Sequence, residues 1–127
     1  MPLPIAQASN FQGSADLALA SAARTTSSTI GLPNLGGPAA VVVIEVNVTA
    51  VSGTTPTLQV ALEDTFDGTN WNNVSNVSGS NITTTGRVVK RLNLQDTPCT
   101  ENVRLSWTIG GTTPSFTFSV NVYFARY

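Results

Sequence analysis

Apolar and polar residues alternate along four stretches of the chain, which flank two copies of one phrase. The copies are Val51-Ser52-Gly53-Thr54-Thr55-Pro56-Thr57-Leu58 and Ile109-Gly110-Gly111-Thr112-Thr113-Pro114-Ser115-Phe116. A period of two is typical of strands with one buried face, and Gly and Pro between such strands are typical of turns. The pattern therefore predicts two similar β-hairpins, each closed by its Gly-Thr-Thr-Pro segment. The apolar positions of the flanking strands are Ile44, Val46, Val48, Leu58, Val60, Leu62, Val103, Leu105, Trp107, Ile109, Phe116, Phe118, Val120, Val122 and Phe124.

Further short strands are expected between other turn signals. Leu17 and Leu19 alternate with alanines, and we favour a strand there over the helix that the alanines would permit. A turn is expected at Asp67-Gly68, followed by a strand that begins at Trp71 and returns this side chain to the core. Seven to nine short strands and no convincing helix predict an all-β fold. We expect an antiparallel β-sandwich that is jelly-roll-like.

The first residues of the chain differ from the rest. Pro2 and Pro4 disfavour a helix or a central strand, and the nearby apolar residues have no periodic partners. We expect residues 1–16 to form an extended N-terminal arm and residues 17–127 to form a single β-sandwich domain. An apolar arm can lie along another surface. The candidate partner-binding residues are Pro2, Leu3, Pro4, Ile5 and Phe11.

Charge is scarce in this chain. Only 10% of the residues are charged and the formal net charge is −1, so solubility depends on Ser, Thr, Asn and Gln. Weak charge repulsion suits a protein that works inside an assembly. A pI near 5.0 argues against nucleic acid as a partner. The longest apolar run, residues 38–44, is too short to cross a membrane, and without a recognisable signal peptide we expect synthesis in the cytoplasm.

Catalytic residue combinations are hard to find in the sequence. The absence of histidine excludes Ser-His-Asp and Cys-His arrangements, and the lone Cys99 is expected to be a small buried hydrophobe. Glu63 and Asp64 are neighbours that would point to opposite faces of a strand. We expect no enzyme activity, no cofactor and no metal site. Calcium is conceivable at Asp64 to Asn70, although acidic turn residues also occur for conformational reasons.

Trp71 offers a different chemistry, because an exposed indole ring can stack on a sugar. Asp67 and Asn70 lie beside it in sequence and could supply the polar contacts that a carbohydrate site needs. The alternative is that Trp71 belongs to the core, as we expect for Trp107. A sugar-binding module therefore remains a second hypothesis.

Three segments carry a resemblance to a known group of proteins: residues 48–58, the Asp67-Gly68-Thr69-Asn70-Trp71 turn, and residues 104–118. Across residues 17–124 the chain resembles small β-sandwich virion proteins of tailed bacteriophages, most closely capsid cement (decoration) proteins. The resemblance implies a non-enzymatic protein that stabilises the shell by binding joints between capsid subunits. It implies the major capsid protein and further copies of this chain, as a homotrimer, as partners, and the outer capsid surface as location. A head-to-tail or tail component is the alternative within the same group.

Overall fold

The computed structural model describes residues 16–32, 41–93 and 102–125, and all regular structure in these ranges is β-strand. The strands are β1 (Asp16–Arg24), β2 (Ser28–Gly31), β3 (Val41–Thr65), β4 (Trp71–Asn76), β5 (Gly86–Asn93) and β6 (Val103–Ala125). The strand favoured around Leu17 is thus confirmed. No helix that could cross a membrane occurs in the described ranges.

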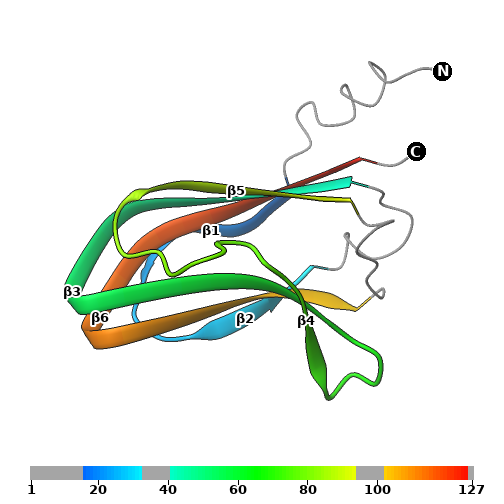
Figure 1. Cartoon of the computed structure of the whole chain (residues 1–127), viewed down its shortest axis with the longest axis horizontal. Helices are drawn as coiled ribbons and strands as arrows, with labels where there is room; N and C mark the ends of the chain where they lie inside the picture. The colour runs from blue at the N-terminus through cyan, green and yellow to red at the C-terminus, as the bar shows by residue number, and fades with distance from the viewer. Residues whose placement is uncertain (1–15, 33–40, 94–101, 126–127) are drawn as a thin grey trace.

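Two long strands organise the molecule. β3 and β6 pair antiparallel along nearly their whole length, from Val41 opposite Ala125 to Asp64 opposite Val103. Both strands bend sharply at the left end of Figure 1 and return along the opposite layer. A strand that passes a corner in this way contributes to both sheets of a sandwich.

The other strands pair with the halves of β3 and β6 and complete two four-stranded layers. In the first layer the order is β1, the second half of β6, the first half of β3, and β5. In the second layer it is β2, the first half of β6, the second half of β3, and β4. All pairings are antiparallel, and this order is that of a jelly roll. The predicted all-β, antiparallel, jelly-roll-like sandwich is confirmed.

The two predicted hairpins are wrong. The strand halves that flank each phrase do not pair with each other, because the chain runs through each phrase as a bent strand. The two phrases instead lie opposite one another, with Val51 opposite Phe116 and Leu58 opposite Ile109. Gly and Pro indicate a change of direction, and local sequence does not distinguish a tight turn from a corner between sheets.

The corner has nearly the same backbone geometry in both copies. Gly53 and Gly111 have φ of 112°, and Thr55 and Thr113 have φ of 47° and 46°. A Cβ atom at Gly53 would lie 2.7 Å from the carbonyl oxygen of Thr113, and one at Gly111 would lie 2.6 Å from that of Thr55. Each phrase therefore needs glycine because of both its own φ and the backbone of the other phrase.

The core lies between the two layers and is built from the alternating positions. Trp107 is buried, as expected, and its ring meets Phe118 edge-on at 6.1 Å between centroids. Ile109 is only partly buried at the corner. The fully buried large side chains are Phe116, Phe118, Ile44, Leu58, Leu62, Leu105, Val42, Val46, Val60, Val120 and Val122.

Some sequence-based expectations fall outside the described residues. Residues 1–15 of the proposed arm (1–16), with Pro2, Leu3, Pro4, Ile5 and Phe11, and residues 94–101, with Cys99, lie outside the described ranges, whereas Asp16 is the first residue of β1. The expectations for residues 1–15 and for Cys99 remain predictions.

Candidate functional site

The candidate site is the loop between β3 and β4, residues 66–70, which carries an exposed aromatic side chain on a hydrogen-bonded turn. It projects from the end of the molecule opposite the corner (Figure 1). The loop rests on Thr65, which is buried and whose backbone N–H donates to the Asn102 carbonyl at 3.1 Å. The Thr65 Oγ1 accepts from the Gly68 N–H at 2.9 Å and donates to the Asn70 carbonyl at 2.7 Å. The base of the loop is thus tied to the sandwich.

Asp67 holds the loop from within. Its Oδ1 accepts from the backbone N–H groups of Thr69 and Asn70, both at 2.8 Å, and its Oδ2 accepts from the Asn70 amide at 2.8 Å. These hydrogen bonds, first those from the Asn70 and Thr69 backbone, hold the pKa of Asp67 well below its usual range. Gly68 has φ of 81°, in agreement with the turn predicted at Asp67-Gly68. The loop is therefore ordered by its own side chains.

Phe66 stands at the start of this loop with 80% of its surface exposed, and among the described residues it is the exposed large hydrophobic side chain. Aromatic residues are enriched in the buried core of protein interfaces, so an exposed ring on an ordered loop is a candidate for contact with a partner. The neighbouring Thr65 is buried, so the backbone here turns Phe66 away from the sandwich. Sequence reasoning missed Phe66 as a site residue. The available signal was an aromatic residue inside a turn, outside any alternating stretch.

Trp71 does not return to the core, which corrects the core interpretation of this residue. It is partly exposed and pairs with Thr65 across the β3–β4 ladder. The guanidinium carbon of Arg104 lies 4.0 Å from the centroid of its ring. Arg104 also donates from Nε to Glu63 Oε1 at 2.8 Å. The pairing register of β3 and β4 shifts between Leu62 and Glu63, an irregularity that simple alternation cannot foresee.

The groups proposed for sugar or calcium are engaged by the protein itself. Arg104 stacks on the Trp71 ring, and Asp67 and Asn70 bond to each other and to the loop backbone. Within residues 16–32, 41–93 and 102–125, no three His, Cys, Asp or Glu side chains gather as a possible metal site. The loop therefore offers an apolar ring rather than free oxygen ligands.

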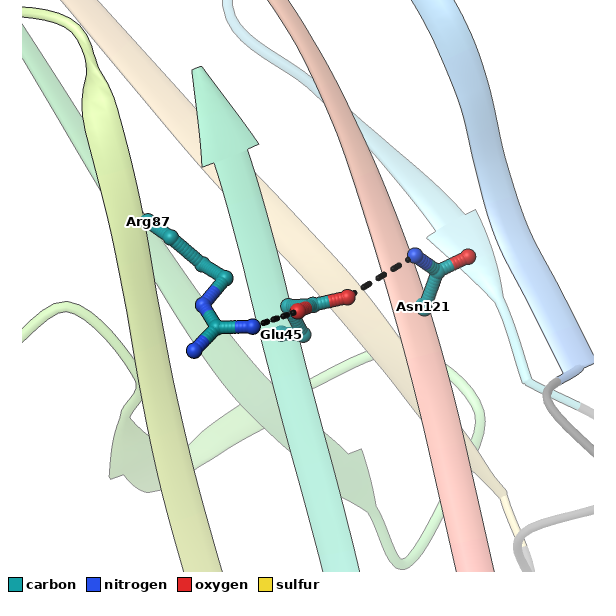
Figure 2. A network of polar contacts seen from close by, with 3 residues as sticks. All are labelled: Glu45, Arg87 and Asn121. Atoms are coloured by element: carbon teal, nitrogen blue, oxygen red, sulfur yellow. Dashed lines mark hydrogen bonds and ion pairs between the residues drawn. The ribbon is translucent and has the colours of Figure 1, made fainter. Parts of the chain in front are cut away.

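The same internal pairing holds on the outer face of the first layer. Figure 2 shows Glu45 of β3 between Arg87 of β5 and Asn121 of β6. Its Oε2 meets Arg87 Nη1 at 3.1 Å and its Oε1 accepts from Asn121 Nδ2 at 3.1 Å. Glu45, Glu63 and Asp67 are thus all paired, and Asp64 is buried and also has an interaction. The carboxylates of these residues are structural.

An open hollow of about 270 Å³ lies along the crossing from β4 to β5. It carries hydroxyl and amide groups but neither an aromatic ring nor a carboxylate, so it lacks both a stacking platform and an acid–base pair. Its lining residues are Ser78, Ser80, Asn81, Ile82, Thr83, Thr84, Thr85, Gly86, Arg87 and Val88.

Comparison with known proteins identifies the fold but no family. The chain matches no protein-family model, and no curated protein matches it in sequence. Among solved structures, the PBSX exported protein XepA aligns with a TM-score of 0.64 and 14% identity, over 100% of this chain and 40% of XepA. The xylan-binding CBM22-1 domain of Paenibacillus barcinonensis Xyn10C aligns with a TM-score of 0.58 and 12% identity, over 91% of this chain and 85% of that domain.

A third similar structure is the Yersinia pseudotuberculosis-derived mitogen, with a TM-score of 0.54 and 10% identity over 86% of both chains. At these identities the likeness shows a shared β-sandwich. Function must then be inferred from the surface of this chain.

Proposed function

We propose that this chain is a non-enzymatic structural protein of a phage virion, a capsid cement protein that binds joints between shell subunits. The observation that carries the proposal is the pairing of carboxylates within the fold. Glu45, Glu63 and Asp67 are held by partners of the same chain, so these three carboxylates form no free acid–base pair. A protein whose acidic side chains are engaged within its own fold is suited to binding by shape and apolar contact.

Several further features support this proposal. The low charge of the chain suits permanent residence in an assembly, and a jelly roll provides a rigid body. The likeness to phage-related XepA over the full chain is consistent with a phage-related role. The major capsid protein as partner, a homotrimeric state and the outer capsid surface are parts of the same proposal.

The test is binding to shells assembled from the major capsid protein that the proposal names as the partner. The full-length protein should co-sediment with the shells in a fixed ratio to the subunits, and electron microscopy should place it at the joints. Deletion of residues 1–15 should leave a folded domain that binds much more weakly, because the arm carries five of the proposed contacts. Full decoration by the truncated protein would remove the arm from the proposal.

A carbohydrate-binding module is the second candidate, favoured by the likeness to the xylan-binding domain and by the partial exposure of Trp71. A sugar would have to compete with the Arg104 guanidinium for one face of the ring, or use the other face. Xylan oligosaccharides should then quench tryptophan fluorescence in the wild type but not in Trp71→Ala. Because Trp71 is not a core side chain, we expect the Trp71→Ala variant to fold. Its urea unfolding midpoint, compared with that of the wild type, checks this. Fluorescence quenching by sugar that depends on Trp71 would favour a carbohydrate-binding module over a capsid cement protein.

A further inference from the structure

The structure assigns the Phe66 loop as a preformed anchor that inserts into an apolar pocket of a partner protein. This inference rests on the proposed function and names the surface through which the sandwich domain itself would hold the shell. The Phe66 loop would thus contact the partner in addition to the predicted N-terminal arm, at a place that the sequence alone did not indicate.

The exposed ring of Phe66 stands on an ordered stretch of backbone. Phe66 is 80% exposed, yet residues on both sides of it are fixed by hydrogen bonds of Thr65 and Asp67. An exposed ring on a disordered loop would lose chain freedom on docking, whereas a ring on an ordered loop loses only its own rotations. A rigidly presented aromatic side chain can serve as the anchor that fills a pocket of the partner.

The side chains around Phe66 favour a protein pocket over a sugar or a membrane surface as its partner. A sugar site needs polar groups around the ring, and those of Asp67 and Asn70 are committed to the loop. An anionic membrane surface attracts Lys and Arg, but residues 63–71 contain Glu63, Asp64 and Asp67 and no basic residue. The nearby Arg104 is paired with Glu63. Asp67 is exposed and accepts hydrogen bonds from neutral N–H groups of Thr69 and Asn70, so its negative charge is kept beside the ring. A protein pocket with apolar walls and a lysine or arginine at its rim fits this combination of ring and charge.

The experiment compares Phe66→Ser, Phe66→Leu and a matched control, Thr69→Ala, in the full-length chain. Thr69 is exposed on the same loop and contributes its backbone N–H, which alanine retains. Urea unfolding should show that all three variants fold, because neither ring nor hydroxyl is buried. Binding to capsid-protein shells and to phosphatidylserine vesicles is then measured by co-sedimentation.

We expect Phe66→Ser to weaken shell binding at least about tenfold, while Phe66→Leu and Thr69→Ala stay close to the wild type. Equal shell binding by the wild type and Phe66→Ser would overturn the anchor and leave the proposed function standing. No shell binding by the wild type would overturn both. Vesicle binding that requires Phe66 would overturn the protein pocket in favour of a lipid surface.

Discussion

At the scale of single residues, the least replaceable positions are the glycines of the corner. Gly53 combines a positive φ with close approach of the opposite phrase, while Gly31 of β2 has open space around its Cα. A side chain at Gly53 would be strained by the backbone conformation and would also clash with the Thr113 carbonyl. The two effects act on the same state and should add.

We predict that Gly53→Ala lowers the free energy of unfolding by about 2–5 kcal/mol, from backbone strain and overpacking together. Gly31→Ala serves as the control and should change it by less than about 0.5 kcal/mol, since nothing lies within 4 Å of the added Cβ. Urea unfolding measures both. A loss in Gly53→Ala no larger than in Gly31→Ala would contradict the close packing of the two phrases.

Asp67 gives a prediction about pH. Its pKa is lowered in the folded protein by hydrogen bonds from the Asn70 and Thr69 backbone, while the pKa of an aspartate in the unfolded chain is about 3.9. The stabilisation from the ionised carboxylate is therefore fully present above that ordinary pKa and declines as the pH falls toward the folded pKa. The difference in urea midpoint between the wild type and Asp67→Ala should be largest near neutral pH and shrink in acid. A difference that grows on acidification would contradict the loop geometry.

At the scale of elements, the burial of side chains in β3 could be predicted from the sequence, but its pairing could not. The alternation of Ile44 to Val48 and of Leu58 to Leu62 correctly predicted which side chains are buried. The partner of each stretch could not be predicted, since pairing over a long sequence separation leaves no local mark. The repeated phrase was the available signal: two similar corners that lie opposite each other would need similar sequences. Trp71 was misjudged and Phe66 was missed, because register shifts and loop direction depend on tertiary packing.

The alternation in β3 predicts unequal effects for neighbouring substitutions. Ile44→Ala should lower the free energy of unfolding by about 2–5 kcal/mol, because this side chain is fully buried between the layers. Glu45→Gln should lower it by less than about 1 kcal/mol, since Arg87 is 66% exposed and surface ion pairs contribute little. Thermal or urea unfolding of the two variants gives the comparison. A loss of unfolding free energy in Glu45→Gln as large as that in Ile44→Ala would contradict this and would show that the polar network of Figure 2 stabilises the fold strongly.

At the scale of the whole molecule, the two layers share β3 and β6 and should unfold as one unit. Amide hydrogen exchange of Val46 in the first layer and Leu105 in the second should report the same free energy of opening. Both residues lie on central strands, so edge fraying does not distinguish them. Markedly faster exchange at Leu105 would show that the second layer opens alone.

The continuous strands also have a mechanical consequence. A pull on Phe66 along the second half of β3 is carried by covalent backbone into the antiparallel ladder with the first half of β6, from Asp64 to Thr57, whose hydrogen bonds lie perpendicular to the strands. Such a force shears many bonds together instead of opening them one after another. If a shell protein holds this loop, as proposed, its pull therefore loads the ladder in shear and does not peel the sheet apart bond by bond.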